Sequence, residues 1–271
     1  MPTVRDLFER VVIIAHREET SRLEAFLRTA EFSVTVQRRV YSEVEAGYSL
    51  QARCLLNHLD AWRTIAQLGK PTLVLEADFV PVASFASLPA PFDPERTPRG
   101  LAWLYAGGPV VYEIDEDGRA IGHSSTTVAL AMTPAAASEL VRFGESEITA
   151  SGGRYTPWDT YLSHRLRRNM DVPTFVPFRQ YGEHGGRSAN DEHTRHGVRG
   201  WHQGDRLAGR LAFLPDYAGG SQLRFRWIRA RANLRGLARL ATGRYLERGA
   251  FGHSPQKLAL LTFALRRWVW P

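Results

Sequence analysis

Two acidic residues separated by a single position, Glu76 and Asp78, give the sequence its clearest chemical signal. They follow an apolar run, residues 72–75, within T-L-V-L-E-A-D-F-V-P-V. Pro81 soon interrupts this pattern, as at the carboxyl end of a buried central strand. Open α/β sheets bind ligands at that end, because the loops there converge on a crevice. Two carboxylates in such a place favour a hard divalent cation, which would in turn hold a diphosphate. The alternative is a pair of hydrated acids that cap the strand.

The surrounding segments alternate between strand and helix patterns. An apolar stripe at helical spacing fills residues 47–68, and Gly69 ends that helix. Thr133, followed by Pro134, begins a further helix that is expected to run to Phe143. Strands that alternate with helices predict an α/β fold whose mainly parallel sheet is covered by helices on both faces. The predicted strands are residues 10–15, 33–36, 72–75, 101–105, 126–132 and 173–177; a hairpin is expected over 110–121 and another helix over 157–168.

Residues 179–206 differ in kind from the rest of the chain. They are rich in histidine and glycine and contain almost no aliphatic side chain, so they cannot form much core of their own. We predict a long polar loop, and long loops inside compact domains are usually functional or disordered. The simplest interpretation is a lid whose polar residues contact substrate or water. No spacing within it matches a zinc-binding signature.

The C-terminal segment is strongly basic. Residues 222–271 hold eleven arginines and lysines against one acid, Glu247, so the first 221 residues carry a net charge of −3 in a chain of +7. Leucines and tryptophans lie among the arginines, which predicts amphipathic helices at an anionic membrane surface, where each basic charge contributes about 1 kcal/mol. One alternative is a solvated face packed on the preceding domain. Nucleic acid binding is a weaker alternative, because no recognised nucleic-acid-binding module is present.

Length and cysteine content narrow the class of protein. A chain of 271 residues can bury a sizeable core, and its one cysteine, Cys54, excludes an intrachain disulfide and a cysteine-based zinc site. The charged first ten residues lack the apolar centre of a signal peptide, and no run reaches the roughly eighteen apolar residues of a membrane span. We therefore expect a cytoplasmic protein, peripheral at the inner face of the membrane, with a domain of residues 1–221 and a basic helical extension of residues 222–271.

Three stretches resemble family 25 glycosyltransferases, the group that contains lipooligosaccharide and collagen galactosyltransferases. The opening V-V-I-I-A-H-R-E-E-T-S-R resembles the family's first strand, loop and arginine, with Arg22 at the arginine position. The segment C-L-L-N-H-L-D-A-W resembles the family's C-A-L-S-H-x-x-x-W: His58 and Trp62 match, and Asn57 replaces a serine. The stretch L-V-L-E-A-D-F-V resembles L-I-L-E-D-D-V, with Ala77 in place of an acid between the two matching acids. A weaker match is P-W-D, ending at Asp159; the resemblance covers about residues 10–180.

The resemblance implies a GT-A fold, a nucleotide-sugar donor, a divalent metal and inversion at the anomeric carbon. Asp78 is the first expected metal ligand, Glu76 is expected beside it to hold the metal, metal-bound water or the donor's ribose, and His184 is the histidine expected to complete the metal shell. Arg22 follows the first strand, where its fork of donors could grip phosphate, and His58 is assigned to the donor site. The metal would be Mn²⁺ or Mg²⁺, since oxygen ligands suit both.

An inverting transfer also requires a carboxylate to take the acceptor hydroxyl's proton. Asp159, at the start of a helix after a Gly-Gly loop, is the candidate base; the alternative is an acid favoured there by the helix dipole. We therefore predict transfer of a hexose from a uridine diphosphate (UDP) sugar to a lipid-linked or polysaccharide acceptor. The rival hypotheses are an inactive, membrane-docked scaffold, favoured by Ala77 and Asn57, and a basic nucleic-acid-binding protein.

Overall fold

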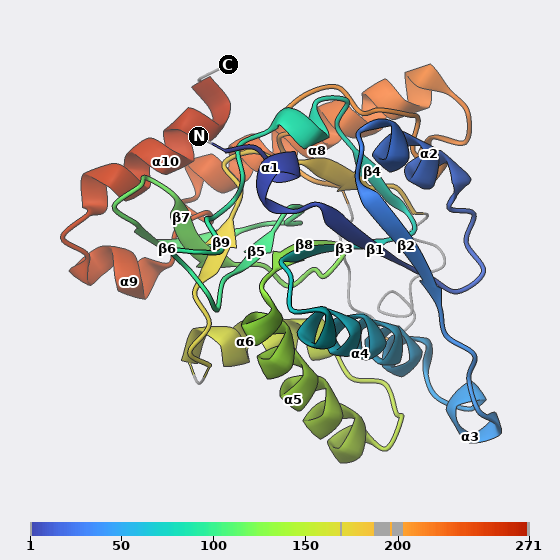
Figure 1. Cartoon of the computed structure of the whole chain (residues 1–271). Coiled ribbons are helices and arrows are strands. Elements are labelled where there is room, and N and C mark those ends of the chain that lie inside the picture. Colours follow the sequence, from blue (N-terminus) through green and yellow to red (C-terminus); the bar gives the residue numbers. More distant parts are fainter. Residues whose placement is uncertain (1, 169, 187–195, 197–202, 270–271) are drawn as a thin grey trace.

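The structure is a computed structural model that describes residues 2–168, 170–186, 196 and 203–269. Its centre is one large mixed sheet (Figure 1). The strands of this sheet are β1 (Arg10–Ala15), β2 (Ser33–Arg38), β3 (Thr72–Glu76), β5 (Leu101–Trp103), β6 (Val110–Ile114), β7 (Ala120–His123), β8 (Ala129–Met132) and β9 (Thr174–Val176).

These eight strands lie in the order β2-β1-β3-β8-β5-β9-β7-β6. Strands β2, β1 and β3 are parallel neighbours, whereas β8 runs antiparallel between β3 and β5. Strand β9 is parallel to β5, and the β6–β7 hairpin closes the far edge with antiparallel pairs. The predicted α/β class is thus confirmed. The three strands β2, β1 and β3 form a parallel unit, and the other five strands are mixed, because β8 and β7 run in the opposite direction.

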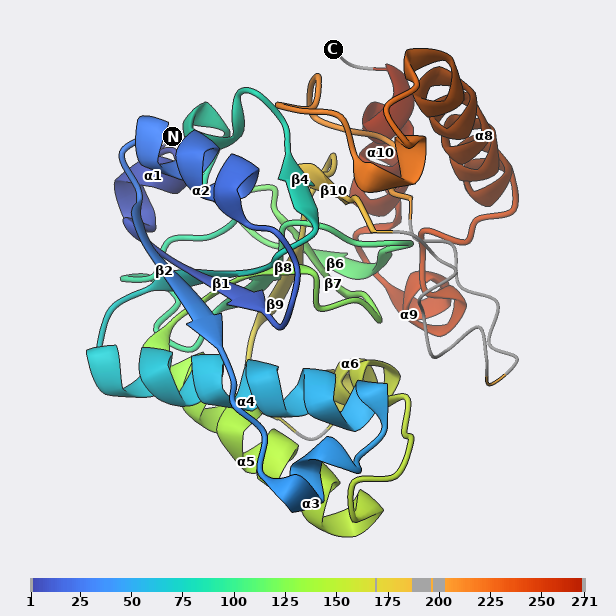
Figure 2. The same ribbon diagram turned by 90° about the vertical axis from the view of Figure 1, so that its right-hand side faces the viewer.

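Helices cover both faces of the sheet, as predicted (Figures 1 and 2). The alternation of β1 explains why: Val12 and Ile14 pack into one core with Trp62, while Val11 and Ile13 pack into the other. One face carries α4 (Leu50–Leu68), α5 (Pro134–Ser151) and α6 (Trp158–Arg168), and the other carries α1 (Val4–Leu7) and α2 (Ser21–Thr29); α3 (Glu43–Ala46) and the short 3₁₀ helices Phe85–Ser87 and Asp216–Ala218 lie in connections.

Local signals set the ends of the two long helices. Gly69 ends α4 in the left-handed conformation at φ 66°, which glycine adopts without steric cost. Thr133 caps α5 by accepting a hydrogen bond from the amide of Ala136, and Pro134 occupies its first turn. The predicted end of α5 at Phe143 was too early, because the helix continues to Ser151 and Gly152 terminates it at φ 57°.

The acidic stretch at residues 72–82 is divided between two sheets. Strand β3 ends at Glu76, the chain turns at Ala77 and Asp78, and β4 (Phe79–Pro81) pairs antiparallel with β10 (Gly182–His184) in a separate two-stranded sheet. The continuous pattern therefore did not predict the turn. The amide of Ala77 still bonds the carbonyl of Ile14 on β1 at 2.9 Å, so the turn begins at the edge of the central sheet.

The prediction of a polar loop from residue 179 onward was wrong for its first part. Strand β10 belongs to a sheet, and the side chains of Gln180 and Glu183 are fully buried. Gln180 uses its amide group to bond both the nitrogen and the oxygen of Ala106, at 2.7 Å each. Polar side chains thus take the place of the missing aliphatic core. Residues 187–195 and 197–202 of the predicted loop lie outside the described residues.

The basic C-terminal segment folds as the helices α8 (Gln222–Ala241), α9 (Arg248–His253) and α10 (Lys257–Val269). Helices α9 and α10 pack beside β6 (Figure 1), where Leu260 and Phe263 join the central core, and α8 contacts α10 and the Asp216–Ala218 helix. Val111 of β6 donates a hydrogen bond to the carbonyl of Tyr245 and accepts one from the amide of Glu247. Among the described helices, none combines the length and the apolar character required to cross a bilayer.

Candidate functional site

The three residues expected to bind metal lie together at the carboxyl end of β3. Glu76 is the last residue of that strand, Asp78 follows in the turn, and His184 ends β10. One ligand atom from each lies within 4.8 Å of the others, and His184 Nε2 is 2.9 Å from Asp78 Oδ2. The structure thus brings together an acidic pair and a histidine more than one hundred positions away in the sequence.

Backbone pairing brings His184 to the acidic turn. Strand β10 pairs with β4 so that His184 lies opposite Phe79, and the amide of Gly185 bonds the carbonyl of Asp78 at 2.8 Å. A side chain at Gly186 would collide with the carboxylate of Asp78. Two consecutive glycines therefore let the backbone pass close to the acidic turn, and this close approach is the structural reason for Gly-Gly after His184.

His184 and the acids form a strongly coupled electrostatic group. Burial alone would disfavour the imidazolium, but the charge of Asp78, its hydrogen bond and the charge of Glu76 outweigh burial and raise the pKa of His184 to about 9. At neutral pH and without a cation, the imidazolium of His184 therefore neutralises Asp78. A divalent cation would have to replace that proton, because a metal binds neutral imidazole.

The raised pKa predicts a specific pH dependence of stability. The folded state holds the His184 proton more tightly than the unfolded chain, whose histidine pKa is about 6.5. The resulting stabilisation is complete below about pH 6.5, declines as the pH rises and is lost above about pH 9. Relative to His184→Gln, the free energy of unfolding should fall by on the order of 3 kcal/mol across this window.

Urea unfolding at a series of pH values, in the presence of a chelator, measures this difference. His164→Gln serves as the control, since His164 is an exposed histidine on α6. A stability difference between the parent and His184→Gln that stays constant with pH would contradict the assigned coupling.

His58 lies beneath Glu76 and is fully buried. Its Nε2 is 3.0 Å from Glu76 Oε1, and its ring packs against Trp62 and Trp158 at centroid distances of 5.6 and 5.3 Å. The hydroxyl of Thr127 also donates to Glu76 Oε1, at 3.4 Å. The structure therefore places His58 behind the acid, where it orients Glu76, and gives it no surface that faces solvent.

Asp159 lies on the neighbouring α6 and acts electrostatically on the same region. It follows Trp158, whose indole bonds the carbonyl of Gln51 on α4 at 3.1 Å, and its Oδ1 accepts from the amide of Thr160. Burial, followed by the charges of Glu76, Asp159 and Asp78, raises the pKa of the Cys54 thiol well above its usual range. The three predicted acids thus act on the same half-buried thiol, although Glu76 ends β3, Asp78 lies in the following turn and Asp159 lies on α6.

Arg22 reaches the opposite side of the acidic turn. With Asp78 it lines a small pocket, but its guanidinium is bonded to Asp216 at 2.9 Å and lies 5.5 Å from the ring of Phe213. Both members of this ion pair are more than half exposed, so the pair contributes little to stability. A phosphate could therefore take the place of Asp216 at modest cost.

Two further features were not predicted from the sequence. Glu183, next to His184, is fully buried and accepts hydrogen bonds from Arg229 of α8 and from the amide of Gly204. Cys54 joins His58 and Glu76 in a second group of potential metal ligands. The signal for the latter is the four-residue spacing of Cys54 and His58 on a predicted helix, which places both on one face.

The donor set of two carboxylates and one imidazole suits Mn²⁺, and it suits Mg²⁺ less well because Mg²⁺ prefers oxygen ligands alone. No family model matches the chain, and no curated protein matches it significantly. The resemblance to family 25 glycosyltransferases therefore depends on the motifs alone.

Proposed function

We propose that this protein is a metal-dependent glycosyltransferase of the GT-A type that uses a UDP-sugar donor. The observation that carries the proposal is the convergence of Glu76, Asp78 and His184 at the carboxyl end of β3. Ligands of open α/β sheets bind at such an end. Support for the GT-A assignment comes from the parallel β2-β1-β3 unit, next to which β8 runs antiparallel.

Each side chain has a part in this proposal. Asp78 and His184 hold the cation, and Glu76, oriented by His58, holds the cation or the donor's ribose. A bound divalent cation supplies charge neutralisation for the departing diphosphate. Arg22 exchanges Asp216 for a phosphate of the donor. Asp159 accepts the proton of the acceptor hydroxyl, so that attack from the face opposite the leaving group inverts the anomeric carbon.

Calorimetric titration of UDP, with and without Mn²⁺, tests the proposal. The parent should bind UDP in a Mn²⁺-dependent way, and Asp78→Asn should weaken that binding by more than about 100-fold, since even outer-shell partners of a metal cost 10- to 100-fold. The matched control is Asp171→Asn, because the side chain of Asp171 is 89 % exposed and pairs only loosely with Arg99 at 3.6 Å.

Three outcomes separate the hypotheses. Mn²⁺-dependent binding that Asp78→Asn abolishes and Asp171→Asn preserves supports the donor site and justifies a screen of hexose donors. Binding that survives Asp78→Asn contradicts the assigned ligand. No binding of UDP to the parent under any metal would overturn the enzyme proposal in favour of an inactive scaffold.

The acceptor is proposed to be lipid-linked or a polysaccharide, and the protein to act at an anionic membrane surface. Helix α8 exposes Leu223, Trp227 and Leu234, with Trp227 72 % exposed, and Arg224 and Arg231 flank them. Exposed large apolar side chains among arginines suit the interface of an anionic bilayer. Nucleic acid binding is disfavoured, because Arg229, Arg239 and Arg267 of the tail bond to the body of the protein.

Vesicle sedimentation tests the membrane proposal. Trp227→Ser should weaken binding to anionic vesicles severalfold, since one interfacial aromatic side chain and its buried apolar area are lost. Val40→Ser is the control, as Val40 is similarly exposed on a different part of the surface. Equal binding of the parent to neutral and anionic vesicles, or an unchanged Trp227→Ser variant, would contradict this surface assignment.

A further inference from the structure

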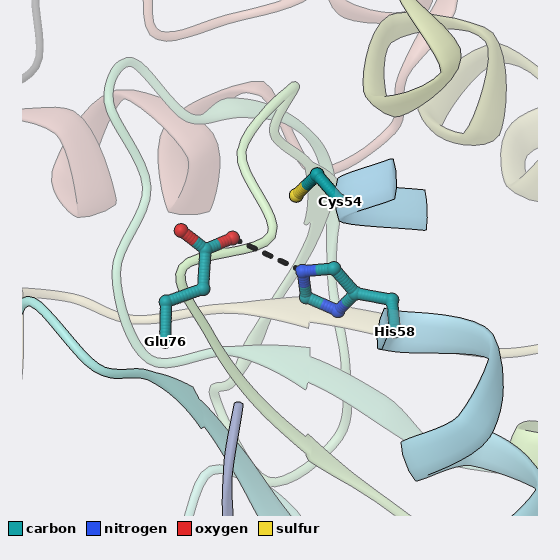
Figure 3. Close-up of side chains that lie close together, drawn as sticks. All are labelled: Cys54, His58 and Glu76. Carbon is teal, nitrogen blue, oxygen red and sulfur yellow. Dashed lines mark hydrogen bonds and ion pairs between the residues drawn. The ribbon is translucent and has the colours of Figure 1, made fainter. Parts of the chain in front are cut away.

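A second group of potential metal ligands lies directly behind the proposed donor site (Figure 3). Cys54 and His58 are one helical turn apart on α4, and both face Glu76 at the end of β3. The Cys54 sulfur, one ring nitrogen of His58 and one Glu76 oxygen all lie within 4.8 Å of one another. Figure 3 shows the thiol and the carboxylate converging on the same side of the imidazole ring.

The chemistry of this group differs from that of the first. A thiolate and an imidazole are the ligands that Zn²⁺ and related thiophilic cations prefer, whereas Mn²⁺ and Mg²⁺ favour carboxylates. Zinc bonds of about 2.0–2.3 Å in a tetrahedron place neighbouring ligand atoms roughly 3.3–3.8 Å apart. The His58–Glu76 distance is already 3.0 Å, so small side-chain movements would complete the geometry. Three protein ligands leave the fourth position open.

The geometry points to a cation site at Cys54, His58 and Glu76 that is selective for Zn²⁺-like ions and competes with the donor-site metal for Glu76. The single cysteine excludes zinc sites built from several thiolates, but not a mixed site of this kind. Trp62 and Trp158 pack against His58 and hold its ring in place.

Glu76 couples the two groups. Among the described residues, groups of three such ligands occur twice, and Glu76 belongs to both. When Glu76 turns toward Cys54 and His58 to hold Zn²⁺, the donor site keeps only Asp78 and His184. Zinc should therefore weaken Mn²⁺-dependent binding of UDP. This antagonism rests on the proposed function, whereas the binding of Zn²⁺ itself does not.

Cobalt(II) provides the direct test, because it substitutes for zinc and gives a thiolate-to-cobalt charge-transfer band in the near ultraviolet. Metal-free full-length protein, titrated with Co²⁺, should develop this band, and Zn²⁺ should displace it. Cys54 is the only cysteine of the chain, so the band can come from no other residue of the protein. The band should be absent in Cys54→Ser and in Cys54→Ala, with folding of both checked by thermal melting.

Two further variants decide how many ligands take part. His58→Gln should lower the affinity for Zn²⁺ by at least about tenfold, the lower limit even for an outer-shell partner. Asp78→Asn should keep the cobalt band, because Asp78 belongs only to the other group. A parent without the band, or a band that His58→Gln leaves unchanged, would overturn the proposed site.

The coupling has its own readout. Zn²⁺ should suppress Mn²⁺-dependent UDP binding in the parent but not in Cys54→Ser. If the cobalt band forms as expected but the parent does not bind UDP in the presence of Mn²⁺, the proposed function fails and the zinc site stands. Equal suppression in the parent and in Cys54→Ser would contradict the coupling through Glu76.

Discussion

Replacement of Arg267 by alanine should lower the free energy of unfolding by about 3–5 kcal/mol, the cost of leaving a buried charge without its partner. Arg267 and Asp205 are both fully buried, and Arg267 Nη2 donates to Asp205 Oδ1 at 2.5 Å. Burial would raise the pKa of Asp205, but the charge and hydrogen bonds of Arg267, with a bond from Tyr245, outweigh it and lower the pKa to about 2. The carboxylate is thus charged throughout the physiological range.

The same arginine also connects the last helix to the sheet. Its Nη1 donates to the carbonyls of Pro177 and Phe178, at 3.0 and 2.7 Å, immediately after β9. Arg267→Ala therefore leaves one carboxylate and two carbonyls without this partner, and the midpoint of thermal unfolding should fall by about 10 °C.

A matched control and a double variant make this prediction decisive. Arg266→Ala removes a neighbouring, exposed arginine of α10 and should change stability by less than about 0.5 kcal/mol. Replacement of both partners, as Asp205→Leu with Arg267→Met, should be less harmful than Arg267→Ala alone, because no unpaired charge remains. Chemical denaturation measures all three, and equal stability of Arg267→Ala and Arg266→Ala would contradict the buried pair.

Much of the fold follows from local sequence patterns. The β-branched run at Arg10–Ala15 and the capped helix after Thr133 are determined by residues close in sequence, and both were predicted. The turn at Ala77 was not, because the apolar pattern continues through Phe79 and Val80, which are buried in the second sheet. An apolar pattern in the sequence indicates that residues are buried, but it does not indicate in which sheet they are buried.

The buried polar contacts explain most of the remaining errors. Gln180, Glu183 and Asp205 were assigned to a polar loop, yet each is buried and bonded to a residue far away in the sequence. Arginines of the tail, such as Arg229, were assigned to a basic surface. A side chain's type suggests exposure, and only the fold supplies the distant partner that makes its burial possible.

The sequence indicated which residues belong to the candidate site, but not which contacts they make. The spacing of Glu76 and Asp78 and the resemblance together selected the acids, and His184 was selected from a segment that offered several histidines. The ion pair of Arg22 with Asp216 could not be foreseen, since 194 positions separate the two residues. Cys54 was interpreted only as a lone cysteine that excludes a cysteine-based zinc site, whereas the structure groups it with His58 and Glu76 as potential metal ligands.

Asp159→Asn should lower kcat for hexose transfer by about 10²- to 10⁴-fold, the usual contribution of a general base. Asparagine preserves the shape of the side chain and its bond from the amide of Thr160, but it cannot accept the acceptor's proton. Mn²⁺-dependent binding of UDP should stay nearly unchanged, because Asp159 does not belong to the group of potential metal ligands formed by Glu76, Asp78 and His184.

The combination of readouts separates a base from a structural acid. If Asp159 only stabilises the start of α6, the substitution should cost at most about 1 kcal/mol of stability and leave kcat intact. If it is the base, kcat should fall at unchanged melting temperature and unchanged KM for the donor. Asp171→Asn should alter neither, since Asp171 lies exposed outside the cluster. The proposed inverting mechanism requires the fall in kcat at unchanged melting temperature and KM. In that mechanism the hydroxyl's proton passes to a carboxylate on the acceptor side, while Asp78 and His184 hold the donor's cation.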